Sequence, residues 1–352
     1  MKLQKGDLLL CEGGDVGRTA IWNDQMEGCY YQNHLHRLRA RFTNEIDPQF
    51  ALYWFWYAFE VGNVYIGRSN ITTIPNLSQS KLGELQIPKP VFDEQRRIAY
   101  VLNTVQTAIE QQARMIALTR ELKSALMLKL FTEGLHGEKQ KETEIGLVPE
   151  SWEVVRIGSL GKCVTGTTPR TSIDEYYFPP EYDFIAPADL GITRNIYDSE
   201  KKISGRGFKI IRSLPKDAVM CVCIGSSLGK VGMTWKDESA TNQQINSVIC
   251  NKNFNARFVY YLLLYYADYW RRFATYSTVP ILNKNRFEGI EVPVTINREE
   301  QCEIADILSS ADAKIEHHAQ TRVLVEELFR TLLHELMTGQ KRVNEIDLSG
   351  VA

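Results

Sequence analysis

Two stretches of the chain carry apolar residues at alternating steps of three and four, which is the pattern of a long helix that packs along one seam. They cover residues 98–130 and 304–336, and neither contains Pro or Gly. A helix of about 38 residues is roughly 57 Å long, so we predict two long helices paired as an antiparallel coiled coil. The predicted seam residues are Ile98, Leu102, Val105, Ile109, Leu126, Leu130, Ile304, Leu308, Ala311, Ile315, Phe329, Leu332 and Leu336.

Polar residues interrupt both seams near their middle. Gln112 lies in the first, and His318 and Arg322 lie in the second. Polar residues in a helix seam lower its stability but can fix the register of the two helices. They could equally face water at the edge of the pair, and the sequence leaves both interpretations open.

The helices belong to a longer internal repeat. The segment DEQRRIAYVLNTVQTAIEQ returns as REEQCEIADILSSADAKIEHH. Upstream, QKGDLLLCEGGDVGRTAIW resembles LPKDAVMCVCIGSSLGKVGMTW, and YYQNHLHRLRA resembles TNQQINSVICN, in the same order. A twofold repeat of roughly 200 residues indicates two similar halves and not a solenoid of many short repeats.

The second half opens with ETEIGLVPESWEVVRIGSLGKCVTGTTPR, for which the first half shows no counterpart. We therefore expect the first half to lack about its N-terminal third. Short β-like runs punctuated by Gly, Pro and Asn predict mixed α/β domains, and with the long helices an α+β fold. The predicted order is a partial domain (1–91), a central helix (92–135), a charged linker (136–150), a complete domain (151–297), a distal helix (298–341) and a tail (342–352).

Composition is that of an ordinary globular protein, with 352 residues, 44% hydrophobic and 24% charged. No apolar run is long enough to cross a membrane and no signal peptide pattern is present, so we expect a soluble cytosolic protein. The seven cysteines form no CxxC pair and are interpreted as reduced thiols, most of them buried. A net charge of −2 gives no overall sign of nucleic-acid binding, although residues 194–216 are locally basic.

The boundaries IPKPVFDEQRRIAYVLNTV and VPVTINREEQCEIADILSSADAKIE each run from a β-like step into E-Q-x-x-I-A at the head of a coiled-coil helix. This arrangement resembles the specificity (S) subunits of Type I restriction-modification systems. LVPESWEVVRIGSLGKCVTGTTPR resembles the usual opening of their target recognition domains, and IGSSLGKVG and TNQQIN strengthen the likeness. The resemblance spans the chain and recurs in both halves.

The resemblance implies a non-catalytic subunit, without a cofactor or metal of its own, whose two target recognition domains each read half of a bipartite double-stranded DNA target. It also implies that the long helices space the domains and dock methyltransferase (M) subunits, two of them, and through these the restriction (R) subunits. Half-sites one turn of B-DNA apart need a separation of about 34 Å, which helices of this length can span. A further expectation is self-association of the chain, because its first domain looks incomplete.

Reading DNA sequence requires polar side chains on loops, with Arg or Lys suited to guanine and Asn or Gln to adenine. Each candidate taken alone is more often a solvated loop residue, but as a set of basic and amide groups on Gly-rich turns they favour DNA contact. In the complete domain they are Thr167, Thr168, Arg170, Arg206, Lys209, Ser226, Ser227, Lys230, Asn242, Gln243, Thr278, Asn283 and Lys284, and in the partial domain Arg18, Gln32, Asn33, Arg68 and Asn70.

Other motifs are weaker. GSSLGKV is one residue too short for a phosphate loop and has Val after the Lys in place of Ser or Thr, which disfavours nucleotide binding. FPPEY has Phe where an adenine methyltransferase motif has Asn or Asp, and Glu where that motif has an aromatic residue. ARFVYYLLLYYADYW could stack on bases, but its helical period favours a core helix. Two rival functions remain: a structural adaptor that binds protein partners without specific DNA recognition, and an enzyme with a cryptic nuclease or methyltransferase site.

Overall fold

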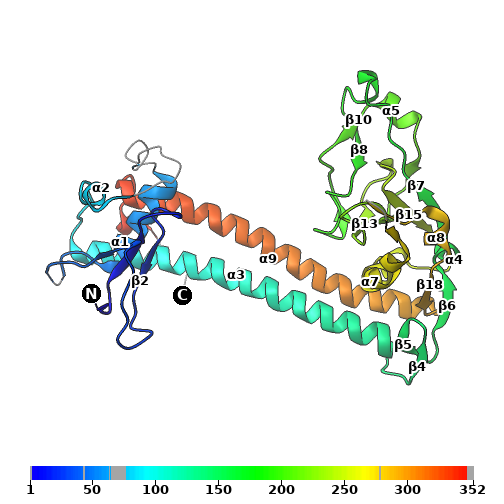
Figure 1. The fold of residues 1–352 in the computed structure, drawn as a ribbon, viewed down its shortest axis with the longest axis horizontal. Helices are drawn as coiled ribbons and strands as arrows, with labels where there is room; N and C mark the ends of the chain where they lie inside the picture. The colour runs from blue at the N-terminus through cyan, green and yellow to red at the C-terminus, as the bar shows by residue number, and fades with distance from the viewer. Residues whose placement is uncertain (1, 43, 63, 65–76, 277–278, 347–352) are drawn as a thin grey trace. The chain divides into compact units, whose positions relative to one another are not determined.

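The computed structural model describes residues 2–42, 44–62, 64, 77–276 and 279–346. The chain divides into two compact units: unit 1 comprises Met1–Arg114 and His318–Ala352, and unit 2 comprises Met115–His317. Two long helices, α3 (Phe92–Glu133) and α9 (Arg298–Thr338), each contribute to both units and are unbroken (Figure 1).

The predicted seam is present, and the helices are antiparallel. In unit 1, Leu102 near the start of α3 packs in the same core as Leu332 near the end of α9. In unit 2, Lys123 Nζ of α3 lies 2.6 Å from Asp312 Oδ1 of α9. Among the predicted seam residues, Ile109, Leu126 and Ile315 are half-buried. Those that are buried are Ile98, Leu102, Val105, Leu130, Ile304, Leu308, Ala311, Phe329, Leu332 and Leu336.

The polar residues near mid-seam divide between the two interpretations. His318 Nδ1 lies 2.7 Å from Gln112 Oε1, so these side chains face each other across the helix pair. Arg322 instead donates from Nε to Glu326 on its own helix at 2.8 Å and is about half exposed. Gln112 and His318 therefore meet as the register interpretation requires, and Arg322 lies at the solvent-exposed edge of the helix pair.

Unit 2 contains a mixed five-stranded sheet in which only the β13–β9 pair is parallel. Its apolar runs form the central strands, and every residue of β12 is buried. In spatial order the strands are β7 (Gly161–Thr165), β15 (Ile245–Cys250), β12 (Val219–Val222), β13 (Val231–Thr234) and β9 (Asn195–Ile196). A four-stranded sheet follows the order β10 (Lys202–Ile203), β8 (Tyr182–Ile185), β14 (Ser239–Thr241) and β11 (Ser213–Leu214).

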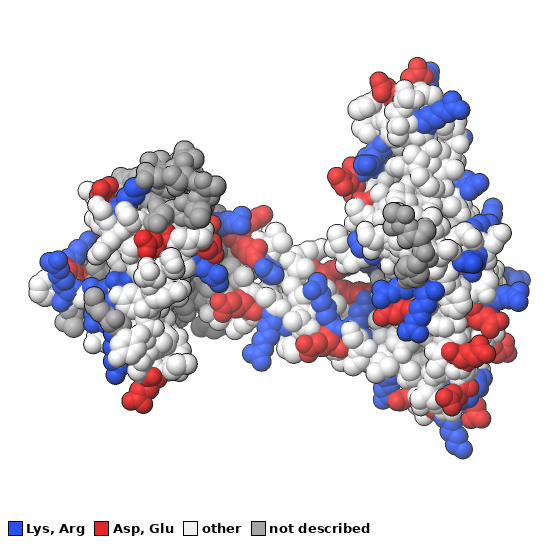
Figure 2. Space-filling model, viewed as in Figure 1, with Lys and Arg blue, Asp and Glu red and all other residues white. Residues whose placement is uncertain are grey.

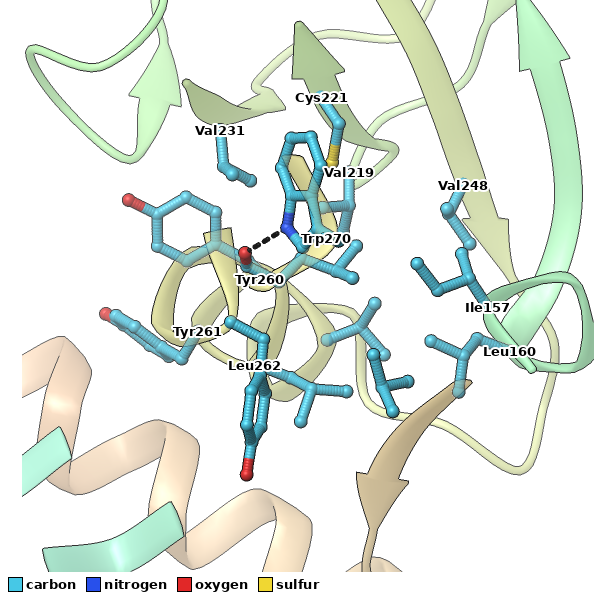
Figure 3. Close-up of a cluster of buried hydrophobic side chains, with 14 of the residues drawn as sticks. Ile157, Leu160, Val219, Cys221, Val231, Val248, Tyr260, Tyr261, Leu262 and Trp270 are labelled. Carbon is cyan, nitrogen blue, oxygen red and sulfur yellow. Dashed lines mark hydrogen bonds between the residues drawn. The ribbon is translucent and has the colours of Figure 1, made fainter. Parts of the chain in front are cut away.

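The aromatic helix α6 (Ala256–Tyr265) is a core element, as the helical period predicted. Its Tyr261 and Leu262 are fully buried among strand residues such as Val219 and Val248 (Figure 3). Trp270, fully buried nearby, donates from Nε1 to the Leu263 carbonyl at 2.8 Å. These rings are therefore not a stacking surface for bases.

Shorter elements complete unit 2. Strand β6 (Glu153–Arg156) pairs antiparallel with β18 (Glu291–Val294). Residues 136–150, predicted as a linker, hold the hairpin of β4 (Gln140–Thr143) and β5 (Gly146–Pro149). The remaining elements are α4 (Ile157–Leu160), η2 (Asp174–Tyr176), α5 (Gly205–Lys209), α7 (Ala267–Trp270), η3 (Arg271–Phe273), β16 (Thr275–Tyr276), β17 (Pro280–Ile281) and α8 (Lys284–Gly289).

Unit 1 repeats the centre of this architecture. Its three-stranded sheet has the order β2 (Thr19–Ile21), β1 (Leu8–Cys11), β3 (Leu35–Leu38). Leu8 pairs with Leu38 as Val219 pairs with Val248 in unit 2, so β1, β2 and β3 correspond in register to β12, β13 and β15. The other elements are α1 (Pro48–Trp56), the π-helix η1 (Tyr57–Val61), α2 (Gln79–Gly83) and η4 (Val343–Glu345).

One buried glutamine ties each α/β domain to its long helix. Gln95 accepts from the backbone N–H of Asp47 (2.9 Å) and donates to the carbonyls of Glu45 and Pro90. Gln301 accepts from the backbone N–H of Asn255 (2.7 Å) and donates in the same way to two carbonyls, those of Asn253 and Thr295. Both are the Gln of the E-Q-x-x-I-A motif, and both are fully buried.

Candidate nucleic-acid interface

Three loops of unit 2 are tied together by hydrogen bonds where β7 ends and β15 begins, and the turn that follows β12 adjoins them through Ile224, whose carbonyl lies 3.5 Å from Gln244 Nε2. We call residues 166–170, 212, 226–230 and 242–244 the loop cluster. The Thr168 hydroxyl donates to Gln243 Oε1 at 2.5 Å. The backbone N–H of Arg212 donates to Thr167 Oγ1 at 3.3 Å, and its Nη1 donates to the Thr165 carbonyl at 2.9 Å. These bonds hold exposed polar side chains in fixed positions.

Glycine allows the closest of these approaches. A Cβ at Gly166 would lie 2.1 Å from the Asn242 carbonyl oxygen, so any larger residue would push the two loops apart. The Asn242 amide donates to Gln244 Oε1 at 3.0 Å, and Gln244 Nε2 reaches the Ile224 carbonyl at 3.5 Å. Asn242 is thus half-buried and its side-chain amide is already hydrogen-bonded within the protein, whereas Gln243 is exposed.

The predicted candidates differ in what their side chains already contact. Arg170 and Ser226 are exposed, while Ser227 and Lys230 are half-buried. Lys230 Nζ donates to the Pro187 carbonyl at 3.4 Å, so its ammonium group already has a partner in the protein. Of the complete domain's candidates, the contacts between loops bring together Thr167, Thr168, Asn242 and Gln243, with Arg170 on the loop of Thr168. Ser226, Ser227 and Lys230 lie on the adjoining turn after β12.

Four other candidates lie on short helices instead. Arg206 forms an ion pair with Glu175, and Lys209 is exposed at the end of the same helix, α5. Asn283 caps α8 by accepting from the Arg286 backbone N–H at 2.9 Å, and Lys284 pairs with Glu288 at 3.4 Å. Thr278 lies outside the described residues.

In unit 1 the candidates lie at the corresponding end of the smaller sheet. Arg18 follows Gly17 as Lys230 follows Gly229, and its Nη1 lies 3.5 Å from Asp15 Oδ2. Gln32 and Asn33 are exposed in the loop before β3, where Asn242 and Gln243 precede β15. Arg68 and Asn70 lie outside the described residues.

The basic stretch 194–216 is split by the fold, and Arg212 is the candidate that sequence reasoning missed. Arg194, at its start, points inward: Nη1 donates to Tyr261 Oη at 3.0 Å and to Ser309 Oγ at 2.5 Å. Arg212, near its end, is exposed. Only tertiary contacts distinguish the inward Arg194 from the exposed Arg212.

Tyr261, which accepts from Arg194, donates in turn to Asp312 Oδ2 at 2.5 Å. Burial and the neighbouring Asp312 carboxylate raise the pKa of Tyr261, so this hydroxyl stays protonated.

The distribution of charged residues does not by itself indicate a nucleic-acid interface. Figure 2 shows Lys and Arg interspersed with Asp and Glu on the face of unit 2 in view. The described residues contain no group of three or more His, Cys, Asp or Glu arranged to hold a metal ion. In the same part of the chain, no helix has the length and apolar character needed to cross a membrane.

All seven cysteines are free thiols. Three are buried and four are half-buried, so the prediction that most are buried was wrong. Burial raises the pKa of Cys163 and Cys223 to about 12 and that of Cys221 well above its ordinary value. These three are protonated packing residues.

The fold and the loop cluster together define a class of protein: twin α/β domains, each joined by a buried glutamine to one helix of an antiparallel pair. The chain belongs to the Type I restriction modification DNA specificity domain family, whose sequence profile matches residues 1–120 and 149–327. This assignment confirms the resemblance seen in the E-Q-x-x-I-A boundaries.

Individual relatives agree. The putative type I restriction enzyme MjaX specificity subunit of Methanocaldococcus jannaschii is 26% identical over 337 residues, covering 93% of this chain and 76% of the relative. The MjaIX specificity subunit of the same organism is 30% identical over 194 residues, covering 53% of this chain and 44% of the relative. The crystal structure of an S subunit from M. genitalium has a TM-score of 0.64 at 19% identity, covering 94% of this chain and 83% of that one, which shows the shared α+β fold.

Proposed function

We propose that the loop cluster of unit 2 reads one half of a bipartite DNA target. The family to which the chain belongs supplies DNA target recognition to Type I restriction-modification systems and is non-catalytic. The observation that carries the proposal is the Thr168–Gln243 bond, because it holds an exposed glutamine amide on the outside of a rigid loop. A glutamine in a fixed orientation can make a bidentate contact with adenine.

The basic residues of the loop cluster suit the phosphate backbone. The exposed Arg170 lies on the same loop as Thr168, and the exposed Arg212 lies on a separate loop whose backbone N–H donates to Thr167. Contacts to phosphate place the protein on the duplex, and contacts to base edges give the sequence preference. We therefore assign the two arginines to positioning and Gln243 to readout.

The test is a comparison of specific and nonspecific DNA binding. The target would be found by methylation-site sequencing of the assembled complex. We expect Gln243→Ala to weaken binding to that target about 5- to 150-fold, corresponding to about 1–3 kcal/mol for a bidentate base contact, with nonspecific binding unchanged. Gln140→Ala, an exposed glutamine on the β4–β5 hairpin, is the matched control. An unchanged ratio of specific to nonspecific affinity for Gln243→Ala would remove it from the interface.

Two methyltransferase subunits would dock on the long helices. Leu118 and Leu122 are exposed on α3, and Leu324 and Leu328 are exposed at the corresponding positions of α9. Contiguous exposed apolar surface is typical of protein–protein interaction sites. Because the pair occurs once in each half of the repeat, we propose one methyltransferase subunit per pair. The restriction subunits would bind through them, and methylation and cleavage would be their chemistry.

We also propose that unit 1 reads the second half-site and that its recognition domain is incomplete within the described residues. The complex would act in the cytoplasm, where its DNA is. Self-association of the chain stays a prediction, and size-exclusion chromatography with light scattering would test it: a strictly monomeric chain would contradict it.

A further inference from the structure

One segment of unit 2 runs from the loop cluster to the long helices. Residues 186–194, which we call the connecting segment, join β8 of the four-stranded sheet to β9 of the five-stranded sheet. Directly before the segment, the Ile185 carbonyl accepts from the backbone N–H of Asn242 in the loop cluster at 3.3 Å. Leu190 is fully buried in the same core as Ile245, the first residue of β15. The connecting segment therefore packs against the base of the loops proposed to read DNA.

The segment also supports the turn that follows β12. Lys230 Nζ donates to the Pro187 carbonyl at 3.4 Å. Gly191 has a φ of +90°, and a Cβ there would lie 3.2 Å from Lys230 Cγ. The Lys230 stem thus lies along the connecting segment, and a movement of the segment would move this turn of the loop cluster.

At its other end the connecting segment reaches the helices through Arg194. Arg194 Nη1 donates to Ser309 Oγ of α9 at 2.5 Å and to Tyr261 Oη of α6 at 3.0 Å. Tyr261 donates to Asp312 of α9, whose other carboxylate oxygen lies 2.6 Å from Lys123 Nζ of α3. One chain of polar contacts therefore joins the connecting segment to α6 and to both long helices.

The position of Arg194 is a poor way to gain stability. Lys123 already balances the charge of Asp312, so Arg194 is a second cation beside one carboxylate. Its Nε is buried and bonds to no atom of the described residues. Burial of a charged group with an unsatisfied N–H is unfavourable. What the planar guanidinium group provides is geometry, because its bonds to α6 and α9 fix where the connecting segment ends.

We propose that Arg194 is a positioning residue for DNA readout, which holds the loop cluster in one place relative to the α3 and α9 residues of unit 2 without touching DNA itself. This proposal rests on the proposed function and adds a control on the spacing of the two half-sites. One base pair moves a half-site by about 3.4 Å along the duplex. A loop cluster that could shift by that distance would accept a displaced half-site, and Arg194 prevents this shift.

The first measurement needs no DNA. Spin labels are attached through noncanonical amino acids at Ser226, exposed on the turn after β12, and at Glu121, exposed on α3 in unit 2. Double electron–electron resonance then gives the distribution of distances between them. We expect Arg194→Met to widen this distribution at least about twofold, because the end of the connecting segment loses both hydrogen bonds to the helices.

The second measurement is the ratio of the affinities of the assembled complex for its target and for the same target with one base pair added between the half-sites. We expect Arg194→Met to lower this ratio at least about fivefold, because a movable loop cluster meets the displaced half-site with less distortion of the DNA. A variant that was merely less stable would lose affinity for both DNAs alike and keep the ratio.

Arg257→Met is the matched control. Arg257 also joins α6 to α9, through an ion pair of 2.7 Å with Asp306, but its side chain is 38% and that of Asp306 61% exposed. Exposed ion pairs contribute little, so both measurements should stay as in the unmodified chain.

Ser309→Ala is a second variant, which removes one of the two bonds and keeps the guanidinium group. It should change both measurements in the same direction as Arg194→Met, to a smaller extent. Unchanged distances in both variants, or an unchanged affinity ratio, would overturn the proposal. If the complex preferred no DNA sequence, the proposed function would fail, and the distances would still show whether Arg194 positions the loop cluster.

Discussion

Gln112 and His318 are counterparts in the repeat, 206 positions apart, and they face each other with His318 Nδ1 2.7 Å from Gln112 Oε1. When two equivalent helices pair antiparallel, only residues at the centre of the pair meet their own counterparts. The bond therefore marks the midpoint of the α3–α9 seam, where a polar pair penalises any shifted register.

Replacing both partners should not destabilise the helix pair. We expect Gln112→Leu with His318→Leu to leave the free energy of unfolding unchanged or to raise it by about 1 kcal/mol, because two apolar groups replace a satisfied polar pair. Gln112→Leu alone should lower it by about 1 kcal/mol, since His318 loses that partner. Urea denaturation of the three proteins would decide, and a double variant less stable than the single would contradict the assignment.

A second contact that should contribute measurably to stability is the ion pair of Lys123 and Asp312. Their side chains are only 15% and 13% exposed. Phe329 takes the place of Lys123 in unit 1, where its ring lies 6.0 Å from that of Tyr53. We expect Lys123→Met to destabilise unit 2 by about 3 kcal/mol, because Asp312 keeps a largely buried charge without its cation. Adding Asp312→Leu should recover part of this loss. Thermal unfolding of the single and double variants measures the coupling, and additive effects would argue against it.

The exposed leucine pairs predict the stoichiometry of the complex. With Leu118→Asp and Leu122→Asp together, or Leu324→Asp and Leu328→Asp together, we expect the chain to retain one methyltransferase subunit where the unmodified chain retains two. Native mass spectrometry of the purified complex gives the count. If both double variants kept two subunits, the leucines would not be the docking surface.

We call Gln95 and Gln301 the glutamine anchors, and we expect each to stabilise only the unit in which it lies. Gln95→Ala removes the side chain that bonds one buried backbone N–H and two carbonyls. We therefore expect it to lower the free energy of unfolding by about 3 kcal/mol. Faster hydrogen exchange should appear in unit 1 for Gln95→Ala and in unit 2 for Gln301→Ala. Gln111→Ala, at an exposed position of α3, is the control. Equal effects of Gln95→Ala on both units would show that the anchor is not local.

Unit 1 should lose stability in acid through Asp7. Burial alone would raise the pKa of Asp7, but hydrogen bonds from Arg39 (2.5 and 2.6 Å) and from the Gln4 backbone outweigh it and lower the pKa. A lowered folded-state pKa gives stability that is present above the ordinary value of about 4 and lost as the pH falls through the folded-state value. Denaturation of unit 1 at several pH values below 5 should show a flatter profile for Asp7→Asn, and an unchanged slope would count against this role.

Much of the fold could be predicted from the sequence because it depends on periodic patterns. The steps of three and four gave both helices to within a few residues, and the repeat located corresponding strands. The buried role of Gln95 and Gln301 could not be predicted, because their partners are backbone groups brought near by tertiary packing.

The candidate site was predictable only as a set of loops. Gly-rich turns and amides pointed to Thr168 and Gln243, but the sequence could not show that Asn242 is used internally or that Asn283 caps a helix. Arg194 and Arg212 belong to the same basic stretch, and only the fold sends one inward and leaves the other exposed.

The glutamine anchors also bear on how such a protein can change. Because each α/β domain meets its long helix through the same three hydrogen bonds to the backbone, loops outside this joint can change without disturbing it. Under the proposed function, a new DNA preference can then arise by exchanging one domain at its glutamine joint, with the proposed methyltransferase contacts on the helices left untouched.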